Sequence, residues 1–322
     1  MVKNSLRSGG ESAIAHPGKG KVIGLFRNNL RAHHAALMDL NPWARASEGA
    51  ARPAQAGSAA PNGLSVMGGE ELAGARRAAA AARNGRGARA WNGWATAMLD
   101  LKCEIGEDAA LSRLWRELAT TDFAGAAFRR GCDFADFLFP GAVDFSGARF
   151  TTDAWFNAAR FAGAVDFSRA IFYCDGFFER AQYSGEACFD RTRWSRAAQF
   201  RLSRFAGKAC FRDTRFDGDA WFIGSRFDAE VSFVATQFAG EAGLGRCAYH
   251  GPADFSLVRF RDNAGLDQAH FEGAACFEDA RFERKAWFQR SRFDAEVSFA
   301  RTQFAGLADF TGVACAKNPG LL

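Results

Sequence analysis

Histidine and cysteine are the residues of this 322-residue chain that would supply a nucleophile, a general base or metal ligands. The five histidines are His16, His33, His34, His250 and His270. None is placed with a Ser or Cys in a repeated catalytic arrangement, and no glycine-rich phosphate loop opens a helix. The eight Cys include no Cys-x-x-Cys pair, and no His accompanies the regularly spaced Cys188 and Cys210. We therefore predict no enzyme activity, no metal site and no cofactor, with reduced thiols.

Arginine recurs directly before a large aromatic residue. Candidate interaction residues of this kind are Arg193, Arg204, Arg215 and Arg226. Closely spaced arginines neutralise phosphates, which would suit a nucleic acid or another anionic partner. Nearby carboxylates such as Asp213, Asp217 and Asp228 offer the alternative that the face is merely solvated. Residues 121–322 hold 25 Lys and Arg against 26 Asp and Glu, so we favour the alternative and expect no nucleic-acid partner.

A second set of candidate interaction residues is aromatic. These residues also directly precede a repeated Phe, and they are Trp155, Phe177, Trp221 and Trp287. If they align along one side of the molecule, they form a stripe that would bind a partner protein. The alternative is that each aromatic ring packs singly over the strands.

The elements that position these side chains follow from a repeat. From Phe123 to Cys315, large apolar residues fall at 36 positions whose gaps alternate between five and six, and 30 of them are Phe. Two residues before each lies a small residue, except at Phe137. Large and small apolar residues two apart point to the same face of an extended segment. Each unit is therefore one short strand plus a corner, and an eleven-residue helical repeat is excluded because Gly, Asp and Ser recur in every turn.

The repeated Phe residues form the predicted core. Those we assign to it are Phe145, Phe150, Phe156, Phe161, Phe167, Phe211, Phe216, Phe222, Phe227, Phe233, Phe277, Phe282, Phe288, Phe293 and Phe299. The equally spaced Trp155, Trp221 and Trp287 also reveal a longer period, which spans twelve units. Three coils of four units fit this period, and so do two coils of six units.

This array resembles the pentapeptide-repeat family, in which a large Leu or Phe is the centre of each five residues and a small residue lies two before it. The resemblance covers about residues 121–316 and is closest to the Phe-centred subgroup, as in Ala253-Asp254-Phe255-Ser256. It implies an all-β solenoid, a right-handed four-sided parallel β-helix with Phe and Ala stacked inside. The six-residue units depart from the family pattern, so two of the four corners must absorb an extra residue.

The chain divides into four parts by composition. Residues 1–62 hold 8 Lys and Arg against 3 Asp and Glu and are rich in Gly, Ala, Ser and Pro, which predicts a disordered basic leader. Residues 63–120 predict a helical N-terminal cap, because 70–83 are Ala-rich and 88–101 and 108–118 carry apolar residues at helical spacings. The β-helix spans 121–316, and 317–322 form a C-terminal tail.

These features favour a non-enzymatic scaffold that binds an unknown protein partner through its outer surface. Relatives that imitate DNA and protect gyrase-type topoisomerases from quinolones use a strongly acidic rod, which the balanced charge of 121–316 does not match. A third alternative is a membrane-peripheral or effector-like protein whose basic leader contacts a membrane. Because Lys19, Lys21 and Arg27 interrupt any apolar signal segment, we predict a cytoplasmic protein. We also expect a homodimer through the C-terminal coil.

Overall fold

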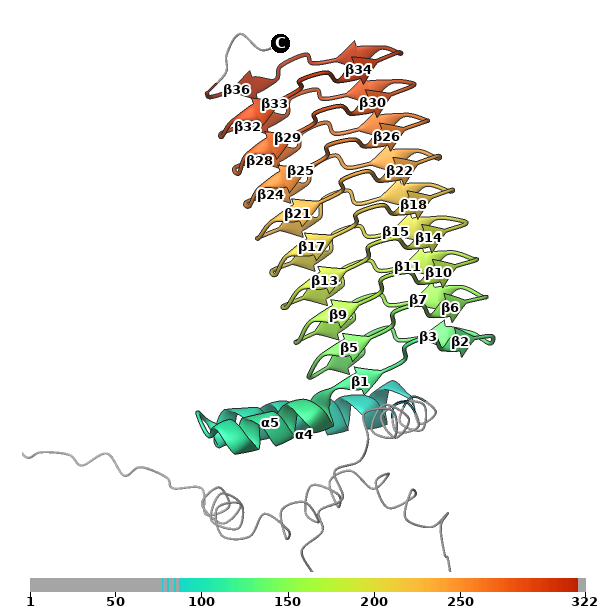
Figure 1. The fold of residues 1–322 in the computed structure, drawn as a ribbon, viewed down its shortest axis with the longest axis vertical. Helices are drawn as coiled ribbons and strands as arrows, with labels where there is room; N and C mark the ends of the chain where they lie inside the picture. The colour runs from blue at the N-terminus through green and yellow to red at the C-terminus, as the bar shows by residue number, and fades with distance from the viewer. Residues whose placement is uncertain (1–76, 78–79, 81–83, 85–86, 318–322) are drawn as a thin grey trace, which may run out of the picture.

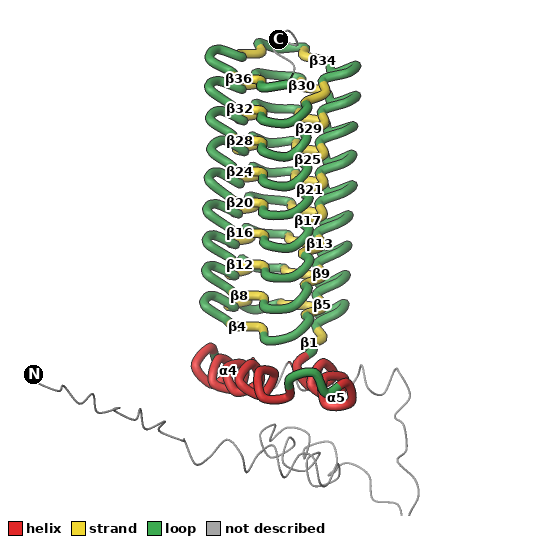
Figure 2. The backbone as a smooth tube through the Cα atoms, turned by 90° about the vertical axis from the view of Figure 1, so that its left-hand side faces the viewer, coloured by secondary structure: helices red, strands yellow, loops and turns green. Residues whose placement is uncertain are grey.

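The computed structural model describes residues 77, 80, 84 and 87–317 and shows a column of stacked coils that stands on two helices (Figures 1 and 2). The helices are α4 (Ala88–Ile105) and α5 (Ala109–Ala119). The Asp108 side chain caps α5 by accepting hydrogen bonds from the amides of Ala110 and Leu111. The predicted leader and most of the predicted helix over 70–83 lie outside the described residues.

Thirty-six two-residue strands form four parallel sheets. Sheet A contains β1 (Thr121–Asp122), β5 (Val143–Asp144), β9 (Val165–Asp166), β13 (Ala187–Cys188), β17 (Ala209–Cys210), β21 (Val231–Ser232), β25 (Ala253–Asp254), β29 (Ala275–Cys276) and β33 (Val297–Ser298). Sheet B contains β2 (Ala127–Phe128), β6 (Arg149–Phe150), β10 (Ile171–Phe172), β14 (Arg193–Trp194), β18 (Arg215–Phe216), β22 (Gln237–Phe238), β26 (Arg259–Phe260), β30 (Arg281–Phe282) and β34 (Gln303–Phe304).

The other two sheets complete the four sides. Sheet C contains β3 (Cys132–Asp133), β7 (Ala154–Trp155), β11 (Gly176–Phe177), β15 (Ala198–Gln199), β19 (Ala220–Trp221), β23 (Ala242–Gly243), β27 (Ala264–Gly265), β31 (Ala286–Trp287) and β35 (Ala308–Asp309). Sheet D contains β4 (Leu138–Phe139), β8 (Arg160–Phe161), β12 (Gln182–Tyr183), β16 (Arg204–Phe205), β20 (Arg226–Phe227), β24 (Ala248–Tyr249), β28 (His270–Phe271), β32 (Arg292–Phe293) and β36 (Ala314–Cys315).

The strand register settles the length of one coil. Thr121 pairs with Val143 in sheet A, and Ala154 pairs with Gly176 in sheet C. Both pairings advance the chain by four units, so the longer period contains three coils, and the alternative of six units in each coil is wrong. The predicted four-sided parallel β-solenoid is confirmed.

The four corners are of two kinds, and they explain the alternating gaps. After sheets A and C, two residues separate the large residue from the next small one, and the small residue's amide closes a tight turn, as from Ala148 to the Phe145 carbonyl (3.0 Å). After sheets B and D there are three intervening residues, such as 151–153 between Phe150 and Ala154. These two wider corners absorb the extra residue, as predicted.

The tight turns hold one residue each in the left-handed region. It is glycine at positions such as Gly147 (φ 63°) but a side-chain-bearing residue at most others, such as Leu202 (φ 58°). Left-handed backbone at the third residue of a turn normally favours glycine. The tight turns without glycine thus accept local strain that the packing of the coils must offset.

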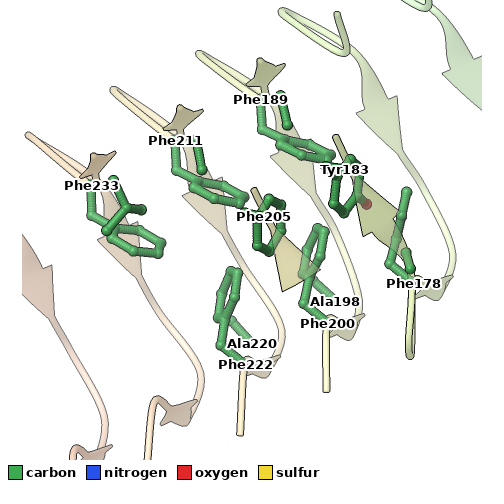
Figure 3. Close-up of a cluster of buried hydrophobic side chains, with 14 of the residues drawn as sticks. Phe178, Tyr183, Phe189, Ala198, Phe200, Phe205, Phe211, Ala220, Phe222 and Phe233 are labelled. Atoms are coloured by element: carbon green, nitrogen blue, oxygen red, sulfur yellow. The ribbon is translucent and has the colours of Figure 1, made fainter. Parts of the chain in front are cut away.

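The core consists of aromatic rings stacked from coil to coil (Figure 3). The Phe200 ring lies 4.8 Å from those of Phe178 and Phe222, nearly parallel to both, and meets Phe189 edge to face at 5.3 Å. Both geometries are favourable for aromatic pairs. The predicted core Phe residues are buried, except that Phe299 is only partly buried because it belongs to the last complete coil.

Buried hydroxyl groups tie neighbouring coils together inside this apolar core. The Ser203 hydroxyl donates to the Phe178 carbonyl (2.6 Å), and the Thr214 hydroxyl donates to the Phe189 carbonyl (2.7 Å). Each acceptor belongs to the tight turn of the preceding coil. These two hydroxyls, which belong to small positions of the repeat, are therefore satisfied despite their burial.

Helix α4 covers the first coil. The indole of Trp91, which is 1% exposed, packs on Phe137 and Phe139 and donates from Nε1 to the Leu138 carbonyl (2.8 Å). The Asn92 side chain accepts from the Leu138 amide (2.8 Å) and donates to the Asp136 carbonyl (3.0 Å). At Leu138 these side chains satisfy the amide and the carbonyl that a further coil would otherwise bind.

Candidate functional site

Two of the thiols are poor nucleophiles near neutral pH. Burial is the main cause that raises the pKa of Cys188 and of Cys247 to about 12, so both stay protonated near neutral pH. Cys188 and Cys210 are register neighbours in sheet A. Among residues 87–317 and the three isolated described residues before them, no group of three His, Cys, Asp or Glu could hold a metal ion.

The outward Asp residues of sheet A serve the turns that follow them. Asp144 accepts from the Ser146 amide (2.7 Å), and Asp166 accepts from the Ser168 amide (2.6 Å). Such Asx contacts stabilise a turn locally. We therefore assign these carboxylates a structural role.

The candidate arginines form two ladders on opposite sides of the column. Arg193 and Arg215 are register neighbours in sheet B, and Arg204 and Arg226 are register neighbours in sheet D. All four are exposed. The ladders therefore present their guanidinium groups to solvent.

Carboxylates pair with three of these four arginines. Arg204 binds Asp228 (2.8 Å), which also pairs with Arg226, and Arg215 binds Asp217 (2.5 Å). In sheet D, hydrogen bonds from Arg292 and His270 hold the pKa of Asp294 below its ordinary value. The pairing makes much of the arginine surface electrically balanced, which agrees with the nearly equal numbers of acidic and basic residues in this part of the sequence.

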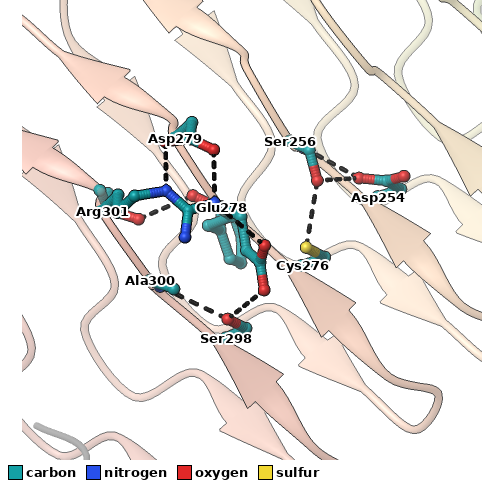
Figure 4. Close-up of polar contacts among 10 residues, drawn as sticks. Asp254, Ser256, Cys276, Glu278, Asp279, Ser298, Ala300 and Arg301 are labelled. Atoms are coloured by element: carbon teal, nitrogen blue, oxygen red, sulfur yellow. Dashed lines mark hydrogen bonds and ion pairs between the residues drawn. The ribbon is translucent and has the colours of Figure 1, made fainter.

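The tight turns continue this pairing from coil to coil. Arg301 makes two hydrogen bonds of 2.7 Å to the carboxylate of Asp279, and the Ser298 hydroxyl donates to Glu278 (2.9 Å) (Figure 4). Exposed ion pairs of this kind contribute roughly 0.2–1 kcal/mol each. They leave few unpaired charges along this edge.

The candidate aromatic residues all lie on sheet C, at its outward position. Trp155 and Phe177 stack with ring centroids 4.1 Å apart, and Trp155 is 39% exposed. Gln199 comes next in register, followed by Trp221, Gly243, Gly265 and Trp287. The four aromatic residues therefore share one face, but they do not form one unbroken stripe.

The residues between Trp221 and Trp287 were missed as candidates. They line a hollow of about 330 Å³, which we call the sheet C notch, and the lining comprises Trp221, Ile223, Glu241, Gly243, Gly245, Arg246, Gly265, Asp267 and Trp287. The signal was present in the sequence: from position 221, the outward residues of successive coils are Trp, Gly, Gly and Trp. Glycines inside a repeat mark a place where side chains are absent from the surface.

A second hollow, of about 430 Å³, lies where the helices meet the first coils. Its lining includes Lys102, Ile105, Trp115, Arg116 and Pro140. The ammonium of Lys102 lies 4.7 Å from the centre of the Trp115 ring. This hollow is more apolar than the notch, and its lining includes the basic residues Lys102 and Arg116.

A family model described as pentapeptide repeats (9 copies) matches residues 134–182, 189–237 and 266–314. These three matched segments fall within the coils and include all four sheets. No curated protein and no solved structure matches the chain. Within the described part of the chain, no helix is both long enough and apolar enough to cross a membrane.

Proposed function

This chain belongs to the pentapeptide-repeat family, and from that premise we propose that it is a non-enzymatic scaffold that binds another protein through the outer faces of its coils. The interior supports this proposal because stacked rings fill it and leave no room for a substrate. Recognition therefore falls to outward side chains.

The stacked pair of Trp155, which is exposed, and Phe177, which is partly exposed, is the observation that carries the proposal. Trp and Phe are enriched at protein interfaces, where they bury large apolar areas. This pair lies on sheet C, whereas the ladders of sheets B and D carry arginines that bind carboxylates such as Asp228 and Asp217. A partner that covers the pair would gain apolar contacts without first separating ion pairs.

Affinity capture from the native host with the full chain tests the proposal. The bait is compared with a variant carrying Trp155→Ser and Phe177→Ser, and captured proteins are identified by mass spectrometry. We expect at least one protein to bind the unaltered chain and to be lost with the variant. A control variant with Arg193→Gln changes a ladder residue and should retain the same protein. Identical capture by all three baits contradicts the proposal.

Imitation of DNA is less well supported. A DNA mimic needs a dense negative surface, whereas Arg204, Arg215 and Arg226 pair with the carboxylates beside them. Binding to a type II topoisomerase in a pull-down would restore this alternative.

Membrane contact depends on residues 1–62, which lie outside the described residues. Co-sedimentation with anionic vesicles, with and without those residues, tests the prediction. Equal binding of both chains contradicts a role for the leader.

A further inference from the structure

Two intervals of sheet C have the same length but different contents. The longer period places a tryptophan at positions 155, 221 and 287, and two outward positions lie between successive tryptophans. In the first interval they are Phe177 and Gln199, and in the second they are Gly243 and Gly265. The first interval is filled, whereas the second is the sheet C notch.

The notch is walled by two indoles and floored by glycine. Trp221 leans over Gly243, where an added Cβ would lie 2.5 Å from its Cε3 atom. At Gly265 an added Cβ would lie 3.9 Å from Cε3 of Trp287 and 3.5 Å from the Asp267 carboxylate. Trp221 and Trp287 are three coils apart, roughly 14 Å at the usual spacing of parallel strands. Both indoles therefore border the open space that Gly243 and Gly265 leave between them.

The side chains that line the notch carry a net negative charge. Glu241 and Asp267 line it against a single cation, Arg246. Neither carboxylate forms an ion pair with another described residue, in contrast to Asp228 or Asp294 on sheet D. Burial, with Asp219 and Asp262 nearby, raises the pKa of Glu241. A cation placed here would relieve that repulsion.

One wall of the notch, the Trp221 indole, already contacts a guanidinium group within the chain. The guanidinium of Arg201, from the coil preceding Trp221, lies 5.0 Å from the centre of the Trp221 ring. Gly243, over which the indole leans, belongs to the coil on the other side. Guanidinium groups combine stacking on indoles with forked hydrogen bonds to carboxylates, which a compact ammonium group does not match.

We propose that the sheet C notch binds the guanidinium group of an arginine side chain on a partner protein, stacked between Trp221 and Trp287 and bonded to Glu241 and Asp267. The proposal rests on the proposed scaffold function and names one chemical feature of the partner. Trp and Arg are enriched among the residues that dominate binding at protein interfaces, and forked hydrogen bonds from Arg to a carboxylate are among the strong ones.

Titration of the full chain with N-acetyl-arginine amide tests the notch directly. The readout is the indole N–H signals of Trp221 and Trp287 in a proton–nitrogen correlation spectrum, assigned by single Trp→Phe variants. We expect both signals to shift with the arginine probe and neither to shift with N-acetyl-citrulline amide, which has the same shape without charge. The Trp155 indole, in the filled interval, should not respond. Equal shifts with the citrulline probe, or shifts confined to Trp155, overturn the proposal.

Two variants distinguish a loss of arginine binding from a loss of folding. Gly265→Gln places in the second interval the side chain that Gln199 places in the first, and its Cβ makes only ordinary contacts. We expect this variant to melt no lower than the unaltered chain and to lose the arginine response. Glu241→Gln with Asp267→Asn should weaken arginine binding by about tenfold, as expected for lost charge-assisted hydrogen bonds. Unchanged affinity in either variant contradicts the proposal.

The outcome is separable from that of the scaffold experiment. If a partner is captured through Trp155 and Phe177 while the notch ignores arginine, only the notch proposal fails. If the notch binds the arginine probe but no host protein depends on any surface variant, the scaffold proposal fails together with the protein partner of the notch, and only the affinity of the notch for a guanidinium group stands.

Discussion

The two ends of the column are built from the same coil but finished differently. At the N-terminal end, Trp91 of α4 lies on the rings of the first coil and binds the Leu138 carbonyl. At the C-terminal end, Phe304 and Phe310 each stack on one ring of the coil before and are only partly buried. Strands β33, β34, β35 and β36 each pair on one side only.

The difference shows that the repeat covers the inner coils but does not cover its own two ends. The rings of each inner coil are covered on both sides by the neighbouring coils. The first and last coils each have one side that the repeat itself does not cover. The N-terminal cover comes from sequence without the repeat, in which Trp91 and Asn92 replace the contacts of a missing coil. Among the described residues, the C-terminal face has no such cover.

The largest expected effect comes from removing a ring in the middle of the column. Phe200→Ala leaves a cavity between Phe178 and Phe222, and we expect it to lower the free energy of unfolding by about 3–5 kcal/mol. Phe310→Ala, at the open end, should cost about 1–2 kcal/mol because its ring is already partly exposed. Denaturant unfolding followed by circular dichroism measures both. Equal losses would show that the open end is covered in solution.

The covered end gives the second prediction. Trp91→Ala should destabilise the chain by about 3 kcal/mol, because a buried indole and its hydrogen bond are both lost. Amide hydrogen exchange should rise first in β1 and β4, next to α4. Trp155→Ala removes an exposed indole of the same size and serves as the control. Equal destabilisation by both variants contradicts the covering role of Trp91.

A buried phenol within the column allows a stabilising change. Tyr183 takes the place of a Phe in sheet D, and its hydroxyl has no hydrogen-bond partner among the described residues. Tyr183→Phe should therefore raise the free energy of unfolding by about 1–2 kcal/mol. Tyr173→Phe, at an exposed position, should change it little. Thermal melting of both variants provides the measurement, and a destabilised Tyr183→Phe would show that the hydroxyl is satisfied.

The smallest expected effect concerns self-association through the open end. Leu307, which is 63% exposed there, and the unpaired edges of the last strands favour end-to-end contact between two copies. We expect a dimer in light scattering at micromolar concentration, and Leu307→Asp should weaken it by about tenfold, or about 1.4 kcal/mol. A monomer at all concentrations would remove this prediction. Asp309→Asn, nearby in the same coil, controls for a change of side chain alone.

The sequence predicted the coils well because their pattern is local. A large residue two positions after a small one recurs along the whole array, so the strands, corners and core followed from spacing. The spacing did not choose between coils of four units and coils of six, since both fit the longer period marked by the tryptophans. Only the pairing of Thr121 with Val143 decides between them.

The surface was harder to predict for physical reasons. Spacing correctly placed Trp221 and Trp287 on one face, but it carried no information on whether their rings face filled or empty positions. Ion pairs such as that of Arg204 with Asp228 join different coils and depend on how long side chains bend. The notch arises because Gly243 and Gly265 have no side chains. Such positions carry no reactive group that would mark them in the sequence.

Asn92 has a consequence for how the chain folds. The pattern of large, small and left-handed residues repeats every two units, so a coil displaced by half a turn would still bury rings and satisfy its tight turns. The interior alone therefore discriminates weakly against slipped pairings. Asn92 bonds both the Asp136 carbonyl and the Leu138 amide, which flank Phe137, the one large residue at a small position of the repeat. We therefore expect helix α4 to fix the strand register of the first coil, and each coil then sets the register of the next one.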